Sequence, residues 1–138
     1  PSFDEEVRIV KQTTMDNHVA LNKILSGTEI LEIQSLIRRI PVVDNVLTYA
    51  VELAAKTRPD SDKAPDFIKE YLSWGAGPRA SQYLVLGAKA HAAINGRYSP
   101  DREDVQAVAA PILRHRIVKN YKAEAEGLDV DDIVKRLL

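Results

Sequence analysis

Hydrophobic residues recur along most of this chain at spacings of three and four, which is the period of an amphipathic α-helix. Proline, glycine and short polar stretches interrupt the pattern and divide it into segments of ordinary helix length. The pattern predicts helices over residues 3–13, 27–40, 44–58, 65–73, 78–95, 101–110, 112–121 and from residue 130 onward.

Polar residues mark where several of these helices begin. Ser26 and Glu29 have the spacing of a capping box, in which each side chain bonds the other residue's backbone N–H. Pro41 is expected to end the helix that Ser26 opens, and Pro111 to split the region after residue 101 into two helices. Further N-caps are expected at Asp44, Ser99 and Asp129.

One apolar stripe on each helix is expected to face a common core. The stripes consist of Ile30, Ile33, Ile37 and Ile40; of Leu47, Ala50, Val51 and Ala54; of Phe67, Ile68 and Leu72; of Tyr83, Gly87, Ala90 and Ile94; and of Val130, Ile133 and Leu137. Residues 19–25 and 40–43 are ambiguous, since they are compatible with strands and could pair as a small ribbon that flanks the helix opened by Ser26. The predicted fold is therefore an all-α bundle over residues 1–138, with at most a minor two-stranded β ribbon.

Composition narrows the class of protein. The 138 residues are enough for one domain with a real core, and 45% of them are hydrophobic, too many for a disordered chain. Nineteen basic and 20 acidic residues give a net charge of −1, which argues against nucleic acid as the main partner. No apolar run is long enough to cross a membrane, and no cysteine is present for disulfides or thiolate metal sites. We expect a cytoplasmic protein, and since the chain opens without methionine, a piece of a longer one.

The residues from Trp74 to Ser81, WGAGPRAS, form the most distinctive segment. Gly75, Ala76 and Gly77 leave the backbone bare, and Pro78 is suited to the first position of a helix, whose start favours anions. Arg79 lies in that first turn, where its charge is disfavoured unless an anion such as phosphate neutralises it. The alternative is an ordinary turn whose arginine is solvated or paired with an acid, and on these residues alone that alternative is the commoner case.

Other charged groups give weaker signals. His18, His91 and His115 are scattered, so no metal site is predicted. Arg114 and Arg116, followed by lysines at positions 119 and 122, form a local basic patch that is either a solvated face or paired with acids. The polar loop from residue 58 to residue 63 is expected to lie on the surface. Replacing Arg58 by alanine should therefore have almost no effect on activity or stability.

Several segments together resemble MoxR-type AAA+ ATPases, in the right order and over nearly the whole chain. The matching segments are PSFDEE at residues 1–6, VVD at 42–44, YAV at 49–51, TRP at 57–59, WGAGPRAS at 74–81 and LRHRI at 113–117. The chain resembles the C-terminal helical lid of these enzymes, and the segment at 74–81 resembles their sensor 2 motif.

The resemblance implies a role in ATP hydrolysis for Arg79. In AAA+ ATPases the nucleotide lies between an α/β core and the lid, and the sensor 2 arginine contacts the γ-phosphate region of its own or a neighbouring subunit. On this basis Arg79 is the expected catalytic residue, and Gly75, Ala76, Gly77, Pro78 and Arg79 the expected residues beside the nucleotide. The resemblance also implies ATP and Mg²⁺ as cofactors of the full-length protein, a hexameric ring, its own core domain as partner, and a client with a von Willebrand A-type domain.

The phosphate-binding loop of such enzymes is missing from these residues. Its sequence, Gly-x-x-x-x-Gly-Lys-Ser/Thr, requires a Gly-Lys pair, and the chain contains none. We therefore expect the chain alone to hydrolyse no ATP and to hold none tightly. A second reading remains open, in which the chain is a protein-interaction module that docks a partner through the patch at Arg114 and Arg116 and has no nucleotide role.

Overall fold

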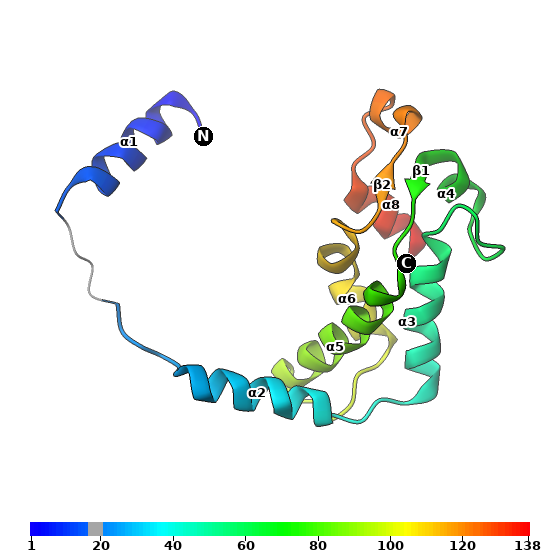
Figure 1. Cartoon of the computed structure of the whole chain (residues 1–138), viewed down its shortest axis with the longest axis horizontal. Helices are drawn as coiled ribbons and strands as arrows, with labels where there is room; N and C mark the ends of the chain where they lie inside the picture. The colour runs from blue at the N-terminus through cyan, green and yellow to red at the C-terminus, as the bar shows by residue number, and fades with distance from the viewer. Residues whose placement is uncertain (17–20) are drawn as a thin grey trace. The chain divides into compact units, whose positions relative to one another are not determined.

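The computed structural model describes residues 1–16 and 21–138, and its elements are mainly helices (Figure 1). The helices are α1 (Phe3–Thr14), α2 (Gly27–Arg39), α3 (Asp44–Lys56), α4 (Asp66–Tyr71), α5 (Pro78–Ile94), α6 (Arg102–Leu113), α7 (Tyr121–Ala125) and α8 (Val130–Leu137). Two short strands, β1 (Leu72–Trp74) and β2 (Val118–Lys119), complete the described part of the chain. This confirms the prediction of an all-α fold with a minor β ribbon.

The chain divides into two units, Pro1–Leu31 and Glu32–Leu138. None of the described residues of the first unit is buried, and α1 is held locally by a capping box between Ser2 and Glu5. The second unit contains the hydrophobic core. That the whole chain forms one domain stays a prediction.

Helix α2 begins as its sequence predicts. The backbone N–H of Ser26 donates to Glu29 Oε2 at 2.6 Å, and the N–H of Glu29 donates to Ser26 Oγ at 3.2 Å, which is the expected capping box. The helix ends at Arg39, two residues before Pro41. Its predicted apolar stripe, however, is not buried, because Ile30 and Ile33 are about half exposed and Ile37 is only partly covered.

The core is formed where α3, α5 and α6 lie side by side, with α8 against α6 (Figure 1). Its fully buried large side chains include Leu53, Ile68, Leu84, Val105, Leu113 and Val134. Many other core positions are alanines, which lets the helices approach closely.

The face that α5 buries differs from the predicted stripe, and the face that α3 buries agrees with it only at Ala50 and Ala54. On α3 the buried residues are Val46, Ala50, Leu53 and Ala54, and on α5 they are Ala80, Leu84, Ala88 and Ala92. Val51, Tyr83 and Ile94, expected inside, are exposed. The close approach of the helices favours small side chains at the contact, so the larger ones lie outside it. The inward residues of α8 are as predicted, with Ile133 and Leu137 buried.

The predicted N-caps at Asp44 and Ser99 and the predicted break at Pro111 were wrong. Asp44 is the first residue of α3 and makes no cap hydrogen bond, and Ser99 does not cap α6, because Asp101 does so in a capping box with Asp104. Pro111 lies inside α6, which continues to Leu113. Proline costs a helical hydrogen bond there, but burial of Leu113 in the core compensates for that loss.

The β ribbon lies elsewhere than predicted. Strand β1 pairs antiparallel with β2, with Leu72 opposite Lys119, whereas residues 21–25 and 40–43 form no strand. Residues 17–20, which include part of the other predicted strand and His18, lie outside the described residues. The expected helix over residues 112–121 is therefore replaced by the end of α6, β2 and the start of α7.

No helix in the described parts of the chain is long and apolar enough to cross a membrane.

Candidate functional site

The candidate site begins where β1 ends and α5 starts. Gly77 is the residue before the helix, in an extended conformation with φ −79° and ψ −179°, and Pro78 occupies the first helical position as predicted. Arg79 follows in the first turn of α5, with its side chain exposed.

The backbone of Ala76 is fixed on both sides by the end of α3. Its N–H donates to Thr57 Oγ1 at 2.8 Å, and its carbonyl accepts from Arg58 Nε at 2.8 Å. Thr57 in turn donates its hydroxyl to the carbonyl of Ala54 at 2.7 Å, so the hydroxyl joins two backbone groups. Thr57 and Ala76 are fully buried.

Gly75 is required by the closeness of the two segments. A Cβ atom at this position would lie 2.3 Å from the carbonyl oxygen of Thr57 and 2.5 Å from the Cα of Arg58. No side chain fits at such distances, whereas a Cβ on Gly77 would meet nothing within 4 Å. The glycine at position 75 thus serves the approach of the loop to α3.

Two separate hollows border this segment. One, of about 440 Å³, is lined by Arg58–Ser61 and by Ser73–Gly77. The other, of about 880 Å³, is lined by Arg79 together with residues of α2, α3 and α5 that include Arg38, Leu47, Val51, Tyr83 and Leu86. The predicted site residues are therefore not all together, since Gly75, Ala76 and Gly77 border one hollow and Arg79 the other, and Pro78 lines neither.

Arg79 is available for a ligand. Within the described residues its side chain has no hydrogen-bond or salt-bridge partner, and neither has that of Arg38 in the same hollow. A cation in the first turn is opposed by the positive end of the helix dipole. An anion beside Arg79 would remove this unfavourable interaction, as the sequence indicated.

The backbone offers fewer donors here than the sequence suggested. The N–H of Ala76 is bonded to Thr57, Pro78 has no N–H, and the N–H of Ala80 donates to the carbonyl of Gly77 at 2.9 Å. The guanidinium of Arg79 and the N–H groups of Gly77 and Arg79, for which the structure shows no acceptor among the described residues, are the donors left for an anion at this helix start.

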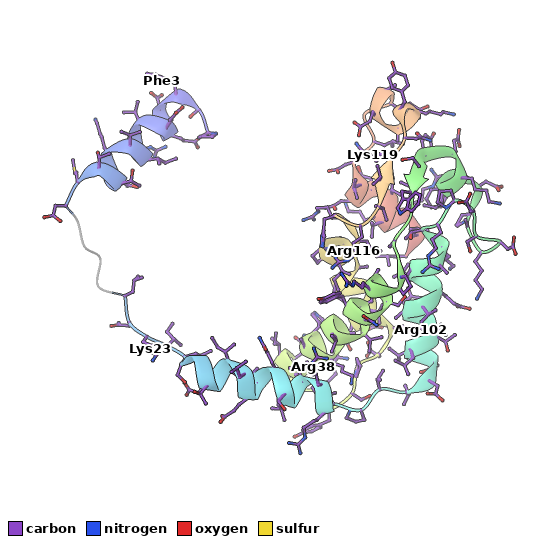
Figure 2. All side chains as sticks on the ribbon, in the orientation of Figure 1. Phe3, Lys23, Arg38, Arg102, Arg116 and Lys119 are labelled. Carbon is purple, nitrogen blue, oxygen red and sulfur yellow. The ribbon has the colours of Figure 1, made fainter. Side chains whose placement is uncertain are left out.

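The basic patch proposed for partner docking is largely neutralised. Arg114 forms two hydrogen bonds with Asp131, at 2.8 and 2.6 Å, and this ion pair holds the pKa of Asp131 below its usual value. Arg116 lies over the ring of Tyr83, 5.0 Å from its centroid, and Lys119, on β2, pairs with Glu124 at 3.3 Å (Figure 2). Lys122 is paired with Glu70. The patch is thus mainly a set of intramolecular ion pairs, which leaves the docking reading without a specific support.

The histidines that the structure describes do not form a metal site. His91 Nδ1 is 2.6 Å from Asp104 Oδ1 inside a structural cluster, and His115 lies next to Arg116. The described residues contain no group of three or more side chains placed to hold a metal ion.

Sequence reasoning missed Thr57 and Arg58. The sequence pattern indicates them only as the end of a helix and predicts Arg58 on the surface. Instead, the Arg58 side chain is half buried and bonded to Ala76, so the expectation that Arg58→Ala is nearly silent does not fit the structure. A threonine at a helix end is a weak signal of a bond, but its partner lies 19 residues away and is a backbone group. No sequence pattern indicates such a partner.

The chain is similar to a known domain family and to several longer proteins. The model of the AAA lid domain family matches residues 66–137. The chaperone MoxR1 of Mycobacterium tuberculosis is 29% identical over 138 residues, covering 100% of this chain and 36% of that protein. The uncharacterised protein YeaC of Bacillus subtilis is 24% identical over 139 residues, covering 100% of this chain and 41% of that protein.

A shorter match and a solved structure agree with these relatives. The protein MoxR of Paracoccus denitrificans is 41% identical over 56 residues, which is 39% of this chain and 16% of that protein. A crystal structure from Cytophaga hutchinsonii, described as a candidate ATPase, superposes with a TM-score of 0.78 and 31% identity over 99% of this chain and 42% of its own. The chain thus spans about two fifths or less of the length of the relatives it matches.

Proposed function

Since this chain belongs to the AAA lid domain family and is similar to the lid of MoxR-type AAA+ ATPases, we propose that it completes the ATP site of a longer ATPase by presenting Arg79 to the phosphates. The single observation that carries the proposal is the position of Arg79, which lies in the first turn of α5 against the helix dipole, is exposed, lines an open hollow and has no partner among the described residues. Arg38 lines the same hollow without a partner, but it lies in the last turn of α2, where the helix dipole favours a cation.

Arg79 would act on the charge that develops during phosphoryl transfer. A guanidinium can contact two phosphate oxygens at once, and its interaction strengthens as negative charge accumulates on the transferred group and the leaving oxygen. The group then lowers the barrier more than it tightens ground-state binding. The bound nucleotide and Mg²⁺ would be held by the core domain, since the chain has no phosphate-binding loop.

The segment before Arg79 has a different part in this proposal. Gly75, Ala76, Gly77 and Pro78 set the path of the backbone from β1 into α5, and the paired N–H of Ala76 is not free to bind phosphate. These four residues would therefore shape the site, and Arg79 would make the contact.

The same proposal covers the assembly. As a lid the chain would contact its own core domain, and in a hexameric ring Arg79 would reach the nucleotide of its own or of an adjacent subunit. Such an ATPase would act as a cytoplasmic chaperone-like motor on a client protein, for which a von Willebrand A-type domain is the expected module.

Replacing Arg79 tests the proposal in the full-length ATPase. We expect Arg79→Ala to lower kcat for ATP hydrolysis about 10²-fold or more. This effect lies at or below the lower end of the range of about 10³–10⁵-fold that arginine fingers contribute to kcat. The change in ADP affinity should be smaller. Arg79→Lys should recover only part of the rate, because an ammonium group cannot make the planar double contact. The measurement is steady-state hydrolysis, with thermal melting of each variant alongside.

The matched control is Arg39→Ala, which removes an exposed arginine of α2 that borders a hollow at the C-terminal end of α5. Arg39→Ala should leave hydrolysis unchanged, and none of the three variants should shift the melting temperature by more than a few degrees, because none removes a bond within the domain. Hydrolysis by Arg79→Ala at the wild-type rate would contradict the proposed role.

A further inference from the structure

The end of α3 and the start of α5 are joined at the backbone of one residue, Ala76. Thr57 and Arg58 hold the N–H and the carbonyl of Ala76, at 2.8 Å each, and Gly75 lies directly against the backbone of these two residues. Among the described loop residues between β1 and α5, Ala76 is the one whose two backbone groups are both bound by side chains of another element.

The connection from Ala76 to Arg79 is short, and it is constrained at Pro78 and at the Gly77 carbonyl. Only Gly77 and Pro78 lie between them, the φ angle of Pro78 is fixed by its ring, and the carbonyl of Gly77 is bonded to the N–H of Ala80. A shift of the Ala76 backbone is therefore expected to move the Cα of Arg79, three residues further on.

We propose that Thr57 and Arg58 are positioning residues for Arg79: by fixing the Ala76 backbone against the end of α3, they determine where the Arg79 guanidinium is presented. This inference rests on the proposed function of Arg79 and adds to it two residues that do not touch the nucleotide. It also gives the lid a route by which the placement of α3 sets the reactivity of the site.

The chemistry of the two side chains suits this task. Thr57 has one hydroxyl proton, which it donates to Ala54, so the oxygen can only accept from Ala76. Serine could make the same pair of bonds, whereas valine has the same shape and can make neither. Arg58 donates through Nε, which a methionine of similar length cannot replace.

The test compares isosteric variants in the full-length ATPase. We expect Thr57→Val and Arg58→Met to lower kcat about 10-fold each, less than the 10²-fold that a full misplacement of about 1 Å can cause, with KM changed less than about twofold. Thr57→Ser should retain nearly the wild-type kcat. Lys63→Ala, which breaks the exposed ion pair with Glu52 in the same α3–α4 connection, is the control and should change neither parameter.

Two readouts separate positioning from simple loss of stability. Amide hydrogen exchange of the peptide over residues 72–80 should become faster in Thr57→Val and stay slow in Thr57→Ser, since only valine leaves the Ala76 N–H without an acceptor. In an Arg79→Ala background, Thr57→Val and Arg58→Met should cause no further loss of kcat, because they act through Arg79.

The outcomes distinguish this inference from the proposed function. If Arg79→Ala lowers hydrolysis but Thr57→Val and Arg58→Met both retain the wild-type kcat, the positioning role is overturned and the role of Arg79 stands. Equal losses with and without Arg79 would also overturn it, since the two residues would then act by another path. If Arg79→Ala itself has no effect on hydrolysis, the proposed function is wrong, and the positioning role that rests on it is overturned as well. Should Thr57→Val not fold, Arg58→Met alone decides, because it leaves the buried hydroxyl in place.

Discussion

Gly75 and Gly77 lie only two residues apart, but the structure leaves no room for a side chain at Gly75 and ample room for one at Gly77. A side chain on Gly75 would overlap the backbone at Thr57 and Arg58, whereas the same addition at Gly77 would point into open space. Gly77 also has an extended backbone that any residue can adopt. A sequence comparison would treat the two as one glycine-rich motif, but the structure separates them.

We expect Gly75→Ala to lower the free energy of unfolding by about 1–3 kcal/mol, the usual cost of forcing an extra methyl group into a filled space. Gly77→Ala should change it by less than about 0.5 kcal/mol, as for an exposed position. Urea denaturation of both variants beside the wild type measures the difference. Equal effects of the two substitutions would contradict the close approach of Gly75 to α3.

At the residue scale, the sequence predicts the helix start at Pro78 and a cation in its first turn, and the structure confirms both. The role of Arg79 and of the segment before it at a nucleotide site stays a prediction. The bonds to Thr57 and Arg58 could not be predicted, because they join a side chain to a distant backbone group and depend on how α3 and α5 pack.

At the scale of elements, a buried carboxylate joins the end of α5 to the start of α6. Asp104 is fully buried and is bonded to Arg97, to His91 Nδ1 at 2.6 Å and to the backbone N–H of Asp101 at 2.9 Å. Burial alone would raise the pKa of Asp104, but the bonds from Arg97, His91 and Asp101 outweigh it and hold the pKa well below its ordinary value.

This cluster predicts how stability depends on pH. Because the pKa of Asp104 is lower in the folded state than in the unfolded state, its stabilising contribution is complete above the unfolded value of about 4 and is lost as the pH falls below it. Asp104→Asn should therefore lower the free energy of unfolding by about 2 kcal/mol at pH 7, since Arg97 and His91 are partly exposed and can be hydrated again.

The check is urea denaturation of both proteins between pH 7 and pH 3. The wild type should lose stability more steeply below pH 4 than the Asn variant, so the two curves should approach each other in acid. A constant difference at every pH would show that the charge of Asp104 is not what stabilises the junction. Asp101→Asn is a suitable comparison, because the Asp101 side chain is about half exposed.

The elements also show which parts of a helix are predictable. The bounds of α5 were correct to within a residue because Pro78 and the Asn95-Gly96 pair mark them, but its buried face was wrong. Large apolar residues such as Tyr83 and Ile94 dominate a periodicity argument, whereas a helix that packs closely on two others buries its alanines. The two strands were missed because segments of three and two residues are too short to show an alternating pattern.

At the scale of the whole chain, all residues of the core cluster come from the second unit, between Val46 and Leu137. The described residues of the first unit contribute none, so the fold of the second unit has its apolar core without them. Removing residues 1–25 keeps the capping box of α2 at Ser26 and Glu29.

We expect this deletion to change the free energy of unfolding of the chain by less than about 0.5 kcal/mol, as for surface changes generally. The measurement is chemical denaturation followed by the fluorescence of Trp74, the only tryptophan of the chain. Helical content per molecule should fall by about the length of α1. A loss of cooperativity on deletion would show that the first unit supports the core.

The pairing of β1 with β2 has a consequence for the entropy of ligand binding. Leu72 and Trp74 are held by the ribbon, Ser73 Oγ bonds the carbonyl of Val118 at 3.2 Å, and Ala76 is bound to α3, so most of the backbone that leads to Arg79 is already ordered. Ordering a residue costs about 1–2 kcal/mol of conformational entropy. Here that loss occurs when the domain folds and does not recur at each encounter with a ligand, so a binding event at Arg79 needs to immobilise little more than the arginine side chain itself.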